Sequence, residues 1–290
     1  MKRLSVIILT YNSEKDIYEC LDSVYKYNDI GDDLEVIVVD NQSREYKAMQ
    51  MRLAQDYPQV RVVQNTHNGG YGQGNNVGIR LAEAPIVAVM NPDVRLLMPT
   101  FSEMLCCFDD PQVMMCGGKQ ILSSGQQGWS IVCSYKMPPF LRLVIRNIAL
   151  RTNHYDYRYM YFAGAFFLVR KESFEQIGMF DEKLFMYSEE PDIHIRLRKQ
   201  FPKSKMCYFP NIQYLHKADA REFSPQRYRV QLTGDAYVFR KHQISYRPHM
   251  RVNILLTYIF QLRAVLRHNA AEASVFKRQR SIIREFLSKK

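Results

Sequence analysis

The sequence lacks any apolar run that could cross a membrane. A spanning helix needs about 20 consecutive apolar residues, and no run among these 290 residues approaches that length. The start, Met1-Lys2-Arg3 followed by apolar residues 4–9, has neither the length nor the small-residue cleavage site of a secretory signal. We therefore expect a cytoplasmic protein and interpret residues 6–10 as a first strand.

The cysteines lack the spacing of a metal site. The six cysteines include no Cys-x-x-Cys pair. Zinc sites built on cysteine usually place ligands at such a spacing, so we expect no zinc site. Without an export signal, the thiols should be reduced, as they are in a cytoplasm.

Acidic residues are almost missing from the end of the chain. From Arg240 to Lys290, twelve Lys or Arg oppose only Glu272 and Glu285, so this tail carries a net charge of +10 out of +11. A basic tail beside a nearly neutral domain suggests an anionic surface as partner. The alternative is a solvated helix face whose charge maintains solubility. Because the basic residues lack the interleaved aromatics of an RNA-binding sheet, we expect no nucleic-acid partner.

The first hundred residues alternate between strand and helix patterns. Apolar runs at 6–10, 34–39, 60–64 and 84–89 are separated by helical patterns over 13–27, 44–57 and about 76–82. Such alternation builds a mostly parallel sheet with right-handed crossovers, flanked by helices. The hydrophobic content of 47% is ample for its core. We therefore predict the α/β fold class, with a nucleotide-binding first half.

The rest of the chain is less regular. We predict strands at 113–122, 159–169, 205–209 and 213–216, and short helices at 171–177 and 192–200. Residues 123–156 mix Gly, Pro and basic residues, which predicts a mobile loop with a short helix on the acceptor side. From Ser224 onward the pattern is helical, with a break around 245–248.

Polar side chains follow the predicted strands where each strand ends. They are Thr10, Tyr11 and Asn12 after the first strand, Asp40 and Asn41 after the second, and Asn91 and Asp93 after the fourth. In open α/β sheets, ligands bind at this edge. Asn91-Pro92-Asp93 by itself could be a turn, or Asp93 could hold a divalent metal together with a diphosphate. The convergence of several polar groups favours the metal.

A glycine-rich segment, Asn68-Gly-Gly-Tyr-Gly-Gln-Gly-Asn75-Asn76, precedes a predicted helix. Exposed backbone amides at a helix start favour a diphosphate. The segment is not the G-x-G-x-x-G of a dinucleotide fold, and no Gly-Lys-Ser/Thr of a Walker loop is present.

A second acidic cluster is Glu189-Glu190-Pro191-Asp192. Three carboxylates in four residues repel one another unless a cation or a proton lies among them. Acidic residues and proline suit the first turn of a helix, which is one interpretation. The other is a general base that takes a proton from an acceptor hydroxyl. His216, near a metal, could be a ligand through neutral imidazole.

Taken together, these motifs resemble the family 2 inverting glycosyltransferases of the GT-A fold, particularly the bacterial rhamnosyltransferase-like branch. The matching stretches are Val6-Ile-Ile-Leu-Thr-Tyr-Asn12, Val38-Val-Asp-Asn-Gln-Ser43, Asn68-Gly-Gly-Tyr-Gly72 with Asn75-Asn76, Asn91-Pro-Asp-Val94, Gly164-Ala165, Gly178-Met-Phe-Asp-Glu182, Phe185-Met-Tyr187, Glu189-Glu-Pro-Asp192 and Arg196.

The resemblance implies roles for individual residues. Asp93 would bind a divalent metal, Mg²⁺ or Mn²⁺, with His216 as a further ligand. Glu190 falls on the position of the base, with Glu189 and Asp192 as alternates. Around the nucleotide sugar we expect Thr10, Tyr11, Asn12, Asp40, Asn41, Asn68, Gly69, Asn75, Asn91 and Asp93.

The implied reaction moves a sugar, with inversion, from a nucleotide diphosphate to a hydroxyl of a glycan or lipid-linked acceptor in cell-surface polysaccharide synthesis. Rhamnose from dTDP-rhamnose is the first expectation, and a hexose from UDP the second. The alternatives are a sugar nucleotidyltransferase and a non-catalytic nucleotide-sugar-binding homologue. Residues 5–13 contain neither Gly nor Arg, which disfavours the nucleotidyltransferase.

We predict a catalytic domain over residues 1–240 and a basic helical extension over 241–290. Residues 1–95 would be the nucleotide-sugar-binding half of this domain, and 96–240 the acceptor half. Residues 254–266 of the extension resemble an interfacial helix that would place the protein on the inner face of the plasma membrane. The alternative is a helix docked on the catalytic domain or on another subunit, as in a homodimer.

Overall fold

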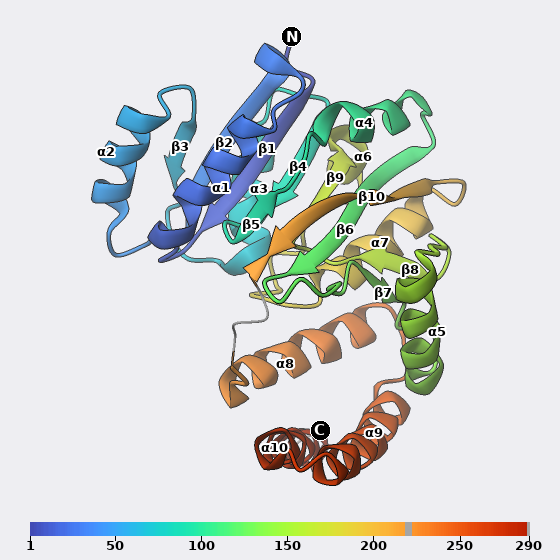
Figure 1. The fold of residues 1–290 in the computed structure, drawn as a ribbon. Coiled ribbons are helices and arrows are strands. Elements are labelled where there is room, and N and C mark those ends of the chain that lie inside the picture. Colours follow the sequence, from blue (N-terminus) through green and yellow to red (C-terminus); the bar gives the residue numbers. More distant parts are fainter. Residues whose placement is uncertain (218–221, 289–290) are drawn as a thin grey trace.

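The computed structural model describes residues 1–217 and 222–288, shown in Figure 1. The strands are β1 (Leu4–Thr10), β2 (Leu34–Asp40), β3 (Arg61–Gln64), β4 (Ile86–Met90), β5 (Val94–Leu96), β6 (Val113–Leu122), β7 (Ile131–Cys133), β8 (Met160–Phe162), β9 (Phe166–Arg170) and β10 (Lys205–His216). The α-helices are α1 (Glu14–Lys26), α2 (Tyr46–Asp56), α3 (Gly70–Leu81), α4 (Phe101–Cys106), α5 (Pro139–Thr152), α6 (Lys171–Gln176), α7 (Glu189–Gln200), α8 (Pro225–Lys241), α9 (Tyr246–Leu266) and α10 (Ala270–Ser288).

One eight-stranded sheet organises the molecule, in the order β3-β2-β1-β4-β9-β6-β10-β5. Strands β3, β2, β1 and β4 pair in parallel, and β6 and β10 run in the same direction. Only β9 and β5 run against them. The predicted mostly parallel sheet is therefore confirmed. The carboxyl ends of β1, β2 and β4 meet at one edge.

Side chains alternate across the sheet and bury both faces. Leu4, Val6 and Ile8 of β1 pack with α1, α2 and α4 on one face. Ile7, between them, packs with α3, α6 and α7 on the other. Because both faces are covered, the strands are continuously apolar, as the sequence shows. The polar residues are left at the strand ends.

Several predicted elements differ from the structure. Most of the glycine-rich segment is not a loop, because α3 already begins at Gly70. Residues 159–169 form two strands in different sheets, β8 and β9, joined by a turn. The predicted loop 123–156 contains β7 and the 14-residue helix α5. Helix α7 begins at Glu189, three residues earlier than predicted.

The C-terminal helices form a separate layer below the sheet edge in Figure 1. Helix α8 packs on the core through Phe239, whose ring centroid lies 4.8 Å from that of Tyr135. Helices α9 and α10 pack on each other and on α8, around Leu232, Met250, Ile282 and Ile283. No helix in the described parts of the chain is long and apolar enough to span a bilayer. The predicted boundary at residue 240 falls at the end of α8.

Candidate active site

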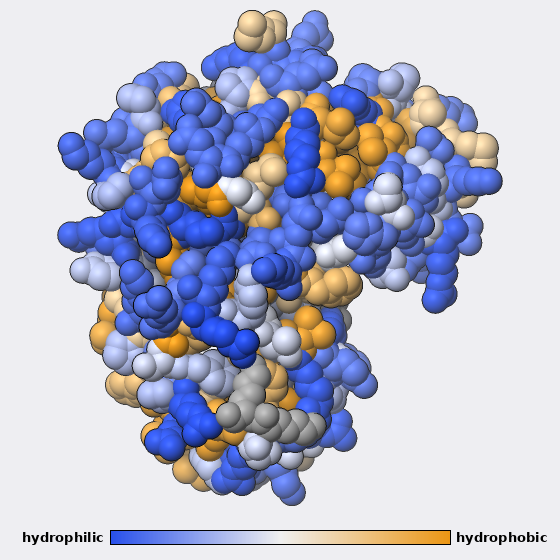
Figure 2. Space-filling model, turned by 180° about the vertical axis from the view of Figure 1, so that it is seen from behind, coloured by the Kyte–Doolittle hydropathy of each residue, from blue (hydrophilic) through white to orange (hydrophobic). Residues whose placement is uncertain are grey.

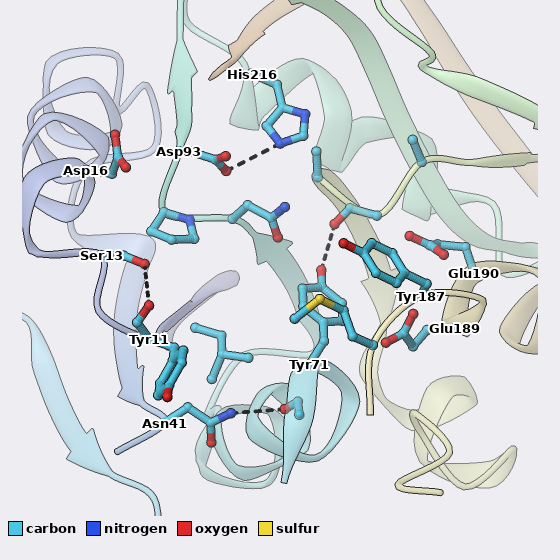
Figure 3. A pocket seen from close by; sticks show the side chains of 18 of the residues that line it. Tyr11, Ser13, Asp16, Asn41, Tyr71, Asp93, Tyr187, Glu189, Glu190 and His216 are labelled. Atoms are coloured by element: carbon cyan, nitrogen blue, oxygen red, sulfur yellow. Dashed lines mark hydrogen bonds and ion pairs between the residues drawn. The ribbon is translucent and has the colours of Figure 1, made fainter. Parts of the chain in front are cut away.

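A cavity of about 820 Å³ opens at the edge where β1, β2 and β4 end. Figure 3 shows two groups of ionisable side chains facing each other across it. Asp93 and His216 lie on one side, and Glu189 and Glu190 lie on the other, with Tyr71 between them. The cavity therefore brings together three motifs that are far apart in the sequence.

Asp93 lies in a tight turn between β4 and β5. The turn is fixed by Asn91 N, which donates to Ala165 O (2.9 Å), and by Val94 N, which donates to Asn91 O (3.1 Å). Strand β5 pairs with β10 so that His216 lies opposite Val94. This register places His216 Nε2 at 3.3 Å from Asp93 Oδ1. The short antiparallel pairing thus builds the predicted Asp93–His216 pair.

The cavity wall is acidic. Asp16, Asp93, Glu189 and Glu190 line it, and within residues 1–217 and 222–288 no Lys or Arg does. The nearby Arg95 is turned towards α1, where its Nη2 lies 2.8 Å from Glu19 Oε2 and 3.3 Å from Asp16 Oδ1. A nucleotide diphosphate would meet carboxylates here and would be repelled by them unless a cation came with it.

The residues present fit a divalent metal that is shared with a diphosphate. A carboxylate and an imidazole are suitable ligands for Mn²⁺ or Mg²⁺, and neither ring nitrogen of His216 makes a hydrogen bond in the described parts of the chain. No third His, Cys, Asp or Glu of the described residues completes a protein-only site. Phosphate oxygens and water would therefore supply the remaining ligands.

Glu189 and Glu190 begin α7 and face the opposite side of the cavity. Burial raises the pKa of Glu189 well above its usual range, and the charge of Glu190 raises it further. Burial also raises the pKa of Glu190, against hydrogen bonds from the backbone at Glu190 and Gly164. The charged form of Glu190 therefore opposes ionisation of Glu189, which is the more readily protonated of the two.

The glycine at position 164 allows Glu190 its position. A methyl group at position 164 would collide with Glu190 Oε1. The carbonyl oxygen of Gly164 also accepts a hydrogen bond from the Tyr71 hydroxyl (2.7 Å). Gly164 therefore connects the base candidate to the floor of the cavity.

The backbone that enters α7 is strained and held from outside. Tyr187 and Ser188 both have a φ of 71°, a left-handed conformation that non-glycine residues rarely adopt. Ser188 Oγ and Tyr135 Oη donate to Asp235 Oδ1 of α8, at 2.6 and 2.5 Å. Such strain persists only where the surroundings fix it, and it is concentrated at functional sites. Helix α8 thereby fixes the start of α7.

Tyr11, Asn41, Asn68 and Asn91 line the cavity as predicted. Tyr11 is exposed at the mouth, where its ring could cover a base. The side chain of Asn41 donates to Asn68 Oδ1 (2.9 Å) and to Gly70 O (3.1 Å). This network fixes the turn into α3, where Gly70 has a φ of +90° and any Cβ would collide with Phe185 O.

Five other predicted nucleotide contacts do not line the cavity. They are Thr10, Asn12, Asp40, Gly69 and Asn75. Asp40 is fully buried and accepts hydrogen bonds from Thr10 Oγ1 (3.3 Å) and Ser43 N (3.0 Å). Asn12 Oδ1 accepts from Arg44 N (3.0 Å). Asn75 donates to Tyr71 O within α3 (2.9 Å). Apart from Asn75 Oδ1, which has no hydrogen-bond partner in the described residues, these side-chain atoms bond to neighbouring groups, so the residues support the edge.

Asp192, the third candidate base, lies outside the cavity. It is fully buried, and Arg196, Lys241 and His242 surround it, each at 2.7 Å. Burial opposes ionisation, but these hydrogen bonds and charges lower its pKa to about 2. One step of a helix rotates a side chain by about 100°, so two residues after Glu190 this carboxylate points away from the cavity.

The sequence analysis missed some lining residues, notably Asp16, Gln120 and Trp129. Trp129, the only tryptophan in the chain, is 59% exposed, and the Arg146 guanidinium lies 4.1 Å from its ring centroid. A sole tryptophan in a stretch without helix or strand periodicity was a usable signal, because exposed aromatics often mark binding sites.

Comparison with known proteins gives a consistent result. A family model described as Glycosyl transferase family 2 matches residues 5–178. The hexosyltransferase Agl10 of low-salt glycan biosynthesis in Haloferax volcanii is 25% identical over 240 residues, 79% of this chain and 72% of the relative. The rhamnosyltransferase WbbL of Escherichia coli is 23% identical over 272 residues, 86% of this chain and 97% of the relative. Other curated relatives are longer, and the chain spans less than a fifth of their length.

The fold also matches solved structures. The mannosyltransferase PcManGT from Pyrobaculum calidifontis, in complex with GDP-Man and Mn²⁺, superposes with a TM-score of 0.62 at 17% identity. The match covers 99% of this chain and 76% of the other. At this identity the match establishes the fold, and it confirms the GT-A architecture predicted from the sequence.

Proposed function

This chain belongs to glycosyl transferase family 2, and on that basis we propose that it is an inverting glycosyltransferase whose donor is a nucleotide-diphosphate sugar, bound with a divalent metal. The acidic cavity carries this proposal. Four acidic side chains line it with no Lys or Arg from the described part of the chain, and Asp93 and His216 lie together at one side. A diphosphate needs a cation in such a site, and these two side chains would hold it.

The metal, when bound, would stabilise the negative charge that develops on the departing nucleotide diphosphate. The residues of the chain have separate tasks. Tyr11 and the Asn41–Asn68 pair would bind the base and ribose, while Trp129 in the cavity wall would position the acceptor.

Glu190 would act as the base. In the single displacement, Glu190 takes the proton of the acceptor hydroxyl as the oxygen attacks the anomeric carbon, and the bond from that carbon to the diphosphate oxygen breaks. Attack from the side opposite the leaving group inverts the anomeric configuration. Glu189, whose side chain is the less exposed of the two, would stay protonated, and Glu190 would be the ionised partner.

For the donor we propose dTDP-rhamnose first, and a UDP-linked hexose second. The rhamnosyltransferase relative supports the first sugar, and the hexosyltransferase relative supports the second. We propose a hydroxyl of a glycan or lipid-linked acceptor in cell-surface polysaccharide synthesis. Donor hydrolysis measured across a panel of nucleotide sugars would identify the sugar.

The metal-binding role of Asp93 can be tested by titration calorimetry with nucleotide diphosphate. Wild-type protein should bind it at least about tenfold more tightly with Mn²⁺ than without, since the cation offsets the acidic wall. Asp93→Ala should lose this gain, while its metal-free binding should be equal to or tighter than that of wild type, because one repelling carboxylate is gone. Asp109→Ala, which removes an exposed carboxylate outside the cavity, is the matched control. Equal Mn²⁺ dependence in all three proteins would refute the assignment.

We further propose that α9 contacts an anionic lipid surface. Six large apolar residues on one face of this helix are exposed, namely Leu255, Tyr258, Ile259, Leu262, Val265 and Leu266. Figure 2 shows hydrophobic residues interspersed with hydrophilic ones over the lower lobe, where the C-terminal helices lie. The helix has three arginines and no acidic residue.

The charge of α9 favours lipid over a second copy of the chain. A copy seated on this face would bring the arginines of two α9 helices together, with no carboxylate on either helix to neutralise them. Anionic headgroups would neutralise them, and the apolar stripe would enter the acyl boundary. Such an arrangement would hold a lipid-linked acceptor near the cavity.

A further inference from the structure

A second cavity, of about 460 Å³, shares no lining residue with the acidic cavity, which we call the donor site. It is enclosed by α7, by the turn between β7 and α5, and by the end of α8. Its lining residues are Ser134, Lys136, Arg158, His194, Ile195, Arg198, Lys199, Lys241, His242 and Gln243. Five of them are Lys or Arg and none is acidic, so this cavity and the acidic cavity at the sheet edge have opposite charge.

Part of this positive charge has no counterion in the described structure. Arg158 pairs with Asp156, and Lys241 pairs with Asp181 and Asp192. Lys136, Arg198 and Lys199 form no ion pair with a described carboxylate. Like charges gathered around a concave surface raise its potential, because the low-dielectric walls focus the field. The cavity is therefore suited to an anion.

The wall also carries neutral hydrogen-bonding groups. His194 is only 4% exposed, and its Nε2 donates to Tyr157 O (3.0 Å). Burial lowers the pKa of His194 to about 4, so the ring is neutral and its Nδ1 is an acceptor. That Nδ1 has no hydrogen-bond partner in the described chain. Ser134 and Gln243 add a hydroxyl and an amide. Acceptors of this kind suit a ligand with hydroxyl groups.

We propose that this cavity binds a phosphate ester of a sugar or polyol, separately from the donor site. Lys136, Arg198 and Lys199 would bind the phosphate, and the neutral groups would bind the hydroxyls. His194 follows Glu190 by one helical turn on the same face of α7, so the two sites share one helix. The ligand is either a phosphorylated part of the acceptor or a free sugar phosphate.

The test uses calorimetric titration of the full chain with glycerol 3-phosphate, at low salt and without Mn²⁺. Glycerol 3-phosphate should bind more tightly than methyl phosphate, which lacks the hydroxyls, and glycerol should not bind. The double variant Lys136→Ala/Lys199→Ala should bind about tenfold or more weakly, since it loses two charge-assisted contacts. Lys47→Ala/Lys277→Ala removes the same charge from exposed sites outside both cavities and should match wild type.

Asp93→Ala should bind glycerol 3-phosphate like wild type, which separates this site from the donor site. An altered rate of donor hydrolysis with the probe bound would identify a free sugar phosphate as the ligand. An unchanged rate would identify a group carried by the acceptor. Absence of binding, equal weakening in the two double variants, or binding lost with Asp93→Ala would overturn the proposal.

Discussion

Two neighbouring glutamates have different surroundings, and this difference supports the roles that we propose for them. Glu189 is 2% exposed, and its Oε1 makes no hydrogen bond in the described residues, so little offsets the free-energy cost of burying its charged form. Glu190 is less buried and receives hydrogen bonds from backbone amides, which favour its charged form. In the proposed mechanism, Glu189 therefore stays protonated and Glu190 is the base.

Glu190→Gln should lower sugar transfer by at least about a hundredfold, because the amide cannot accept the proton. Donor binding should stay within about twofold, since the donor is held at the other side of the cavity. Transfer rates and nucleotide titrations measure the two effects. In Glu189→Gln the amide replaces a neutral carboxyl, so this variant should retain most activity. If Glu189→Gln is inactive and Glu190→Gln is active, the roles are reversed.

Some of the side chains that line the cavity could be predicted from the sequence. Asp93, His216, Glu189 and Glu190 line the cavity because each follows a strand or begins a helix at the ligand edge. Asp40 and Asp192 were predicted by the same reasoning but bond to neighbours instead. Whether a polar side chain faces a ligand or its own backbone depends on rotation about single bonds, which spacing in a sequence does not determine.

Helices α7 and α8 are joined by a buried ionic cluster. Asp192 of α7 contacts Lys241 and His242, at the end of α8, as well as Arg196 within its own helix. Asp235 of α8 holds Ser188 at the other end of the contact. The position of Glu189 and Glu190 thus depends on a helix that follows them by more than 30 residues.

Asp192→Asn should lower the free energy of unfolding by about 2 kcal/mol at neutral pH, because the folded pKa of about 2 lies below the unfolded value of 3.8. A depressed pKa stabilises the fold above the unfolded pKa, and this stabilisation is lost as the pH falls through about 2. Urea unfolding should therefore show a difference from wild type that narrows below about pH 4.

Asp56→Asn, which breaks an exposed pair with Arg52, is the control and should cost no more than about 0.5 kcal/mol. The account of the buried cluster would be contradicted if both variants lost a similar free energy of unfolding. It would also be contradicted if the loss for Asp192→Asn did not change with pH.

Elements were predictable where the periodicity was strong. Strands β1, β2 and β4 are short, apolar and bounded by polar residues, and they were placed within two residues. The break between α8 and α9 was placed near Ser245, whereas the break before α10 was not predicted. The length of α5 was underestimated because its proline and basic residues are typical of a loop. Its apolar residues instead pack under β7 and β8, around Ile131 and Ala149. Tertiary packing overrides local propensity there.

The whole molecule combines an acidic cavity with a basic and apolar C-terminal layer. The tail charge of +10 was apparent from composition. The orientation of α9 was not, because a helix with apolar residues on several sides can turn any of them outward. The structure packs Met250 and Ala264 inward and leaves Leu262 and Leu266 exposed.

The triple variant Leu255→Ser/Leu262→Ser/Leu266→Ser should bind vesicles containing phosphatidylglycerol at least about tenfold more weakly than wild type, because exposed leucines contribute through burial in lipid. Co-sedimentation measures this. Leu97→Ser, at an exposed position elsewhere, is the control. Wild-type protein should also bind uncharged vesicles more weakly than vesicles containing phosphatidylglycerol. Equal sedimentation of all proteins would exclude the lipid contact, and a dimer lost only in the triple variant would indicate a second copy instead.

The pairing of β5 with β10 has a consequence for folding. It joins Asp93 to His216 across a loop of about 120 residues. Closing so long a loop has a large conformational-entropy cost, so this contact should form late in folding. During synthesis the amino-terminal strands can form first, and a nascent chain would present its base-binding edge before it could hold a metal. Affinity for the diphosphate would then arise only once the second half of the sheet has closed.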